Sequence, residues 1–95
     1  RRNEELAKRL VAVENTAASY QFAQIDKSIE DEATRVEYAK MKMVQAAQSG
    51  DINSQMEFLE QLTDAKQRLN QVQHYKKQQL ETANRLGIQI VELPK

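Results

Sequence analysis

The sequence predicts an all-α protein: a long antiparallel helical hairpin, or coiled coil, with an N-terminal helical extension and a short extended C-terminal tail. Two observations predict this fold. Apolar residues recur at alternating gaps of three and four positions through most of the 95 residues, which is the spacing of one helical face. The helix-breaking residues are two Gly and one Pro, and they fall at Gly50, Gly87 and Pro94, where we expect elements to end.

Residues 1–15 are predicted to form the N-terminal helical extension. Its apolar residues, with gaps of four, three and four, mark one helical stripe: Leu6, Leu10, Val13 and Ala17. Asn15 and Thr16 are the weak point, because either side chain can cap a new helix. We expect the helix to pass through them, since the apolar pattern continues, but the sequence leaves a break here open.

Residues 16–49 are predicted to form the first long helix. They carry an a/d heptad pattern with one polar member, Glu32: Phe22, Ile25, Ile29, Glu32, Val36, Ala39, Met43 and Ala46. The stripe of the extension does not continue into this pattern in phase, because it would reach Gln24 and Lys27 instead. A stutter in the coiled coil or a change of packing partner produces such a shift.

Residues 50–51 are predicted to form the turn. Gly50 suits the left-handed position just beyond a helix end, and Asp51 can cap the helix that follows. So short a connection sends the chain back antiparallel. The return helix, 52–86, again alternates gaps of four and three: Phe58, Leu62, Ala65, Leu69, Val72, Lys76, Gln79, Ala83 and Leu86.

The two patterns agree when they are folded onto each other. If the turn centres between Gly50 and Asp51, residue i of the first helix faces residue 101 − i of the second. Val36 then faces Ala65, and Ile29 faces Val72. Glu32 then faces Leu69, and Arg68 and Arg35 are near enough to offer it a partner. The predicted residues of the helix–helix seam are Phe22, Ile25, Ile29, Val36, Met43, Phe58, Leu62, Leu69, Val72 and Leu80.

The open end of the hairpin is the predicted partner-binding region. The return helix ends opposite Asn15, which leaves the apolar stripe of the extension uncovered. The tail, residues 87–95, is β-branched, and it either lies back on that stripe or adds a strand to the sheet edge of a partner. The candidate partner-binding residues are Leu6, Leu10, Val13, Ile88, Ile90, Val91 and Leu93.

No residue pattern predicts catalysis, a cofactor or a metal. His74 is the single His and there is no Cys, so nucleophilic triads and zinc sites lack partners. The acidic run Glu30-Asp31-Glu32 cannot converge on one ion, because consecutive helical side chains point about 100° apart. We expect it to be a solvated face in which Asp31 pairs with Arg35.

Composition bounds the partners. Fourteen Lys and Arg balance fourteen Asp and Glu, which argues against nucleic acid. No apolar run reaches the length of a membrane span, and no small-molecule substrate is indicated. Because a single seam is a small core, we expect self-association or docking on a larger body. The chain begins at Arg1 rather than Met, so we also expect it to be part of a longer protein.

The segment from Tyr38 through Ala46-Ala47-Gln48-Ser49-Gly50-Asp51 to Leu69 resembles the coiled-coil hairpin of tailed-phage capsid assembly scaffolding proteins and related coil-containing virion proteins. The resemblance covers roughly residues 20–86. It implies a non-enzymatic, oligomeric structural protein that contacts coat or portal subunits, inside the virion or procapsid or in the host cytoplasm. The basic C-terminal helix–turn–helix of many scaffolds is not matched. The alternative is a cellular coiled-coil adaptor excised from a larger protein.

Overall fold

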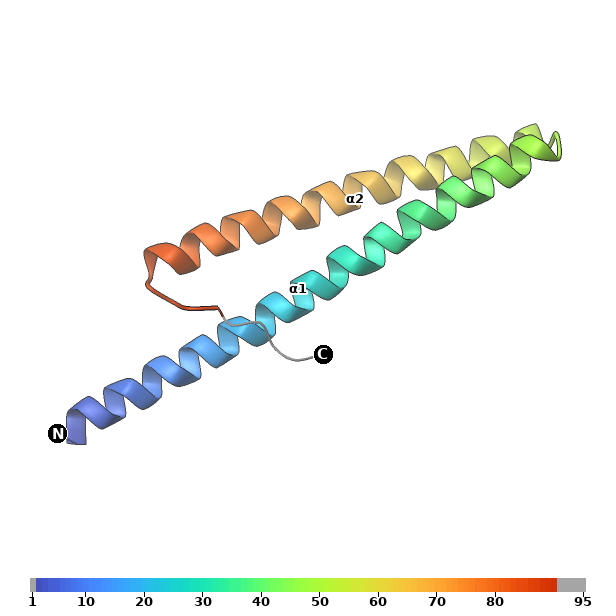
Figure 1. Cartoon of the computed structure of the whole chain (residues 1–95). Coiled ribbons are helices and arrows are strands. Elements are labelled where there is room, and N and C mark those ends of the chain that lie inside the picture. The colour runs from blue at the N-terminus through green and yellow to red at the C-terminus, as the bar shows by residue number, and fades with distance from the viewer. Residues whose placement is uncertain (1, 91–95) are drawn as a thin grey trace. The chain divides into compact units, whose positions relative to one another are not determined.

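The computed structural model describes residues 2–90 and contains two helices, α1 (Arg2–Gln48) and α2 (Ile52–Arg85) (Figure 1). The predicted all-α hairpin is confirmed. Helix α2 ends one residue before the predicted boundary, and residues 88–90 belong to no helix or strand. Val91, Leu93 and the rest of residues 91–95 lie outside the described part of the chain.

Helix α1 passes through Asn15 and Thr16 without a break. The Thr16 hydroxyl donates to the carbonyl of Ala12 at 2.9 Å, and the Ser19 hydroxyl donates to the carbonyl of Asn15 at 2.8 Å. These bonds to the preceding turn satisfy both hydroxyls inside the helix. Neither hydroxyl therefore caps a new helix, and the extension and the first long helix are one element.

The turn combines a C-cap and an N-cap. Gly50 has a φ of 73°, its N–H donates to Ala47 O at 3.2 Å, and the Asp51 N–H donates to Ala46 O at 2.9 Å. This pair of bonds is the Schellman motif, which requires a left-handed residue after the helix. Asp51 Oδ1 then accepts the Ser54 N–H at 3.1 Å, so the same residue ends the turn and starts α2.

Hydrogen bonds from Ser54 also favour the ionised form of Asp51, the capping residue. The Ser54 hydroxyl donates to Asp51 Oδ2 at 2.7 Å. This bond, followed by the backbone bond from Ser54, holds the pKa of the Asp51 carboxyl below its ordinary value of 3.8. Both bonds favour the charged carboxylate.

The end of α2 repeats the same C-cap. Gly87 has a φ of 72°. Its N–H donates to Asn84 O at 3.2 Å, while the Ile88 N–H donates to Ala83 O at 2.9 Å. A glycine is therefore required at both helix ends for the same reason, since other residues are strained in this conformation.

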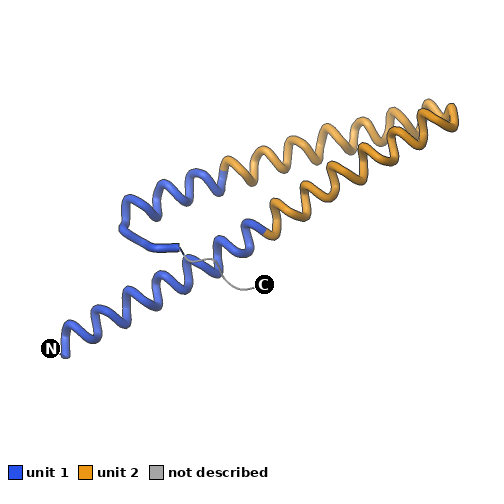
Figure 2. The backbone as a smooth tube through the Cα atoms, in the orientation of Figure 1, with its two compact units in different colours: residues 1–26, 75–95 blue, residues 27–74 orange. Residues whose placement is uncertain are grey.

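The chain divides into two compact units (Figure 2). One unit is Lys27–His74, which holds the turn, and the other combines Arg1–Asp26 with Tyr75–Lys95. In the turn unit, the buried core is Val36, Ala39, Leu62 and Ala65, with Met43 and Leu69 packed against it. These contacts follow the antiparallel register in which Ala39 faces Leu62 and Val36 faces Ala65.

Glu32 occupies a core position of the same unit and is only 8% exposed. Arg35 Nη1 donates to Glu32 Oε1 at 2.6 Å, and Arg68 Nε donates to Oε2 at 3.2 Å. The expectation that Arg68 and Arg35 can partner Glu32 is confirmed, whereas the expected pair of Arg35 with Asp31 is wrong. Arg35 lies three residues after Glu32, on the side that faces α2, and the carboxylate there is desolvated and takes both guanidinium groups.

The second unit has a smaller core. Phe22, Ile25 and Ala83 are buried there, and so is Ser19. Lys76 Nζ forms an ion pair with Asp26 Oδ1, which accounts for the polar residue that interrupts the heptad pattern of α2. Of the predicted seam residues in the whole chain, Phe22, Ile25, Val36 and Leu62 are buried, and Ile29, Met43, Phe58, Leu69, Val72 and Leu80 are half-buried.

Candidate protein-interaction surface

The first five turns or so of α1 carry a row of exposed apolar side chains, which we name the N-terminal stripe: Leu6, Leu10, Val13, Ala17 and Tyr20. The exposed fractions are 55% for Leu6, 60% for Leu10, 65% for Val13 and 61% for Tyr20. Every described residue from 2 to 14 is exposed, so this stretch of helix has no packing partner within the described chain.

The N-terminal stripe lies on the face of α1 opposite to the one that is buried in the same unit. Val13 precedes Phe22 by nine residues, and at about 100° per residue this separation turns the side chain by about 180°. Tyr20, two residues before Phe22, is also turned by about 160°. Helix α1 therefore has two apolar faces, one buried and one exposed.

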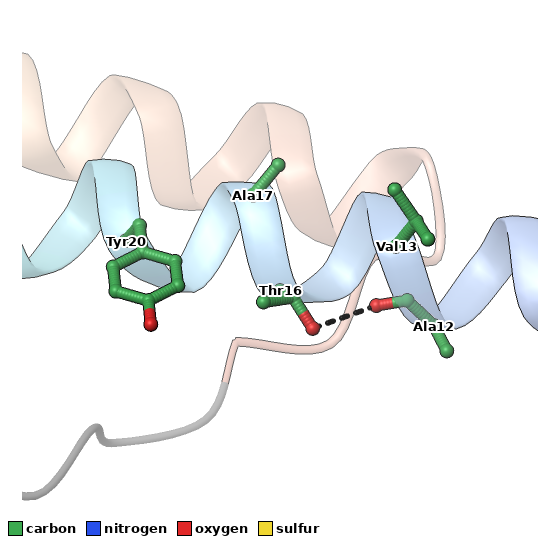
Figure 3. A pocket seen from close by; sticks show the side chains of 5 residues that line it. All are labelled: Ala12, Val13, Thr16, Ala17 and Tyr20. Carbon is green, nitrogen blue, oxygen red and sulfur yellow. Dashed lines mark hydrogen bonds between the residues drawn. The ribbon is translucent and has the colours of Figure 1, made fainter.

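A shallow depression on this exposed face is lined by Ala12, Val13, Thr16, Ala17 and Tyr20 (Figure 3). All five side chains come from successive turns of α1. The Thr16 hydroxyl is used by its own helix, in the bond to Ala12 O. The depression is thus an apolar surface open to a large partner, without the converging polar groups that orient a small ligand.

The described part of the tail meets α1 away from the N-terminal stripe. The Gln89 N–H donates to Asn15 Oδ1 at 3.1 Å, and Ile88 and Ile90 are half-buried. Asn15 precedes Phe22 by seven residues, about two helical turns, and so shares the face of Phe22. Of the predicted partner-binding residues, the structure leaves Leu6, Leu10 and Val13 exposed and half-covers Ile88 and Ile90, while Val91 and Leu93 are not described.

A second group of exposed apolar side chains lies in the turn unit: Tyr38, Met41, Val44, Ile52, Met56 and Leu59. Neither the Asn15 anchor of the tail nor the Asp26–Lys76 ion pair was predicted from the sequence. The latter had a signal, because a Lys at a seam position of α2 needs an acid close to the facing residue, Ile25.

The described residues offer little for other kinds of site. In the range 2–90, no three His, Asp or Glu side chains are grouped so that they could hold a metal ion. Neither α1 nor α2 has the combination of length and apolar character that crossing a membrane requires. His74 is exposed on α2.

Comparison with protein-family models, with curated proteins and with solved structures found no match for this chain.

Proposed function

We propose that this chain is a non-enzymatic structural protein that assembles with other protein through the N-terminal stripe. The observation that carries the proposal is the exposure of Leu6, Leu10 and Val13, at 55 to 65%, in one row on a helix. Fully burying an exposed Leu or Val side chain is worth about 1.5–3 kcal/mol, and each of these side chains still has more than half of that burial to gain. A row of this kind is typical of a helix that docks against a partner.

The caps support a mechanical role for the rest of the chain. Two backbone hydrogen bonds and the Asp51 cap hold the Gly50 turn, which directs α2 back along α1. The core of the turn unit is made by residues of one chain. The hairpin is then a preformed arm, and its free α1 end makes the contacts. Weak contacts of this kind gain strength when many copies act together.

The more specific form of the proposal is capsid scaffolding, or an internal virion protein that contacts coat or portal subunits. It rests on the resemblance of residues 20–86 to such proteins. The alternative is a cellular coiled-coil adaptor. Copy number separates them, because a scaffold occupies many symmetry-related positions and an adaptor forms a dimer or a one-to-one complex.

Site-specific photo-crosslinking in the cell that makes the protein tests the proposal. A photoreactive amino acid at position 10 is expected to give covalent protein adducts, because Leu10 lies in the centre of the N-terminal stripe. The matched control is the same amino acid at position 60, since Glu60 is exposed on α2. Adducts from position 10 that Val13→Glu removes would support the proposal, and equal or absent adducts at both positions would refute it.

A further inference from the structure

We infer that the N-terminal stripe binds a second copy of this chain, helix α1 to helix α1, in parallel and in register. This inference rests on the proposed function, for which it names the partner. It begins from the spacing of the N-terminal stripe. Gaps of four and three from Leu6 to Tyr20 place Leu10 and Ala17 at a positions of a heptad, and Leu6, Val13 and Tyr20 at d positions.

The same heptad assigns the charges beside the N-terminal stripe. Arg2 and Arg9 fall at g positions, and Glu14 falls at an e position, with Ala7 and Gln21 at the other e positions. In a parallel coiled coil, a g residue lies beside the e residue five positions later on the partner. Arg9 of each copy would therefore meet Glu14 of the other, which makes two ion pairs related by the twofold axis.

An antiparallel arrangement loses this complementarity. It brings g residues beside g residues and e residues beside e residues, so that with the whole N-terminal stripe paired Arg9 would lie beside Thr16 and Glu14 beside Ala7, and neither ion pair would form. Each exposed ion pair contributes a few tenths of a kcal/mol, and the parallel arrangement has two of them where the antiparallel one has none. Charge complementarity thus selects the parallel arrangement.

Asn3 selects the register and the number of strands. It falls at the a position one heptad before Leu10, where a single Asn favours its own equivalent in a parallel pair over apolar neighbours. The β-branched Val13 at a d position favours more than two helices. This preference is weaker than that of Asn3, because a buried Asn must find a hydrogen-bond partner and Val13 has no polar group. Slipping by one heptad would bury Asn3 against Leu10, so one register is preferred.

The fold leaves room for this contact and sets its length. The buried face of α1, marked by Phe22 and by the tail anchor Asn15, points about 180° away from the N-terminal stripe, so the second copy meets neither α2 nor residues 88–90. Beyond Tyr20 the same face continues with Gln24 and Lys27, where apolar contact ends. The interface therefore spans residues 3–20, about 27 Å of helix, and is short enough to dissociate on dilution.

Sedimentation equilibrium of the purified chain tests the inference through a charge swap. Arg9→Glu places Glu beside Glu14 in both pairs, and Glu14→Arg places Arg beside Arg9. Each variant is expected to dimerise about tenfold more weakly than the natural chain at low salt. A mixture of the two variants, in which every facing pair is again opposite in charge, is expected to recover the affinity. Lys66→Glu, on α2, lowers the net charge by the same amount as Arg9→Glu and is the matched control for that variant.

A second pair of variants tests the apolar contact itself. Val13→Glu puts a carboxylate in the interface and is expected to weaken dimerisation at least about a hundredfold. Val44→Glu is its control, because Val44 is 52% exposed on the same helix but outside the N-terminal stripe. Circular dichroism of each variant checks that the helices remain formed.

The remaining outcomes overturn the inference in distinguishable ways. Association of Arg9→Glu as tight as that of the natural chain would mean antiparallel pairing, and a mass of three or more chains would overturn the two-copy arrangement. A monomer at all concentrations, together with adducts to a different protein from position 10, would refute the second copy and leave the proposed function standing. A monomer with no such adducts would refute both.

Discussion

Leu62→Ala measures how much of the hairpin depends on its narrow core. Leu62 is 6% exposed and belongs to the cluster with Val36, Ala39 and Ala65. Truncating a buried Leu to Ala costs about 2–5 kcal/mol, depending on how far the surroundings collapse into the space. Two of its cluster partners are already Ala, which cannot move to fill the gap, whereas the outer edges of a two-helix core can relax. We therefore expect about 3 kcal/mol.

The assay is urea unfolding followed by circular dichroism at 222 nm, at one low protein concentration so that self-association contributes equally to every sample. Leu59→Ala is the matched control, because Leu59 lies three residues earlier on α2 and is 51% exposed. It is expected to cost less than about 1 kcal/mol. Equal losses for the two variants would refute the assigned register.

Three further predictions concern the turn and the buried carboxylate. Gly50→Ala forces a residue with a side chain into a φ of 73°, and it is expected to lower the free energy of unfolding in urea by about 1–2 kcal/mol. An unchanged free energy of unfolding would mean that the turn has another conformation. Asp51 has a lowered pKa, so its ionised form stabilises the fold above pH 3.8, and the contribution disappears as the pH falls through the lowered pKa. The difference in stability between the natural chain and Asp51→Asn is therefore expected to shrink only at acid pH, and a difference that is constant from pH 2 to 7 would contradict the cap. Glu32→Leu, which fills the core position with a hydrocarbon, is expected to be at least as stable as the natural chain, whereas Glu32→Ala is expected to be less stable, by about 1–3 kcal/mol. Thermal unfolding in which Glu32→Leu is clearly less stable than the natural chain would show that the ion pairs with Arg35 and Arg68 outweigh packing.

Much of the fold could be predicted because the chain is repetitive and its breakers are few. Gly50 fixes the turn, and once the turn is placed, the heptad patterns determine which residues of α1 and α2 face each other. The core of Val36, Ala39, Leu62 and Ala65 follows from that arithmetic alone. The final residue of α2 differs by one position because Leu86, although apolar, serves in the Schellman cap before Gly87.

Side-chain pairing was harder to predict than backbone. The hairpin register placed Arg35 and Arg68 near Glu32, but Arg35 can also reach Asp31 from the same helix. The choice between the two carboxylates depends on which of them α2 desolvates, and local spacing does not state this. The hydrogen bond from Gln89 to Asn15 joins residues 74 positions apart and has no periodic signal. By contrast, the shift in phase between Val13 and Phe22 was visible in the sequence, and the continuous helix shows that it separates two faces of α1.

Hydrogen exchange at two protein concentrations tests the central claim most directly, because it reports on the N-terminal stripe and the core in one experiment. The amides of residues 3–14, which have no packing partner within the described chain, are expected to exchange fast in dilute solution and to become protected as the concentration rises. The amides around Val36 and Leu62 are expected to exchange slowly at both concentrations. Exchange at residues 3–14 that is independent of concentration would contradict the pairing of two copies through this surface.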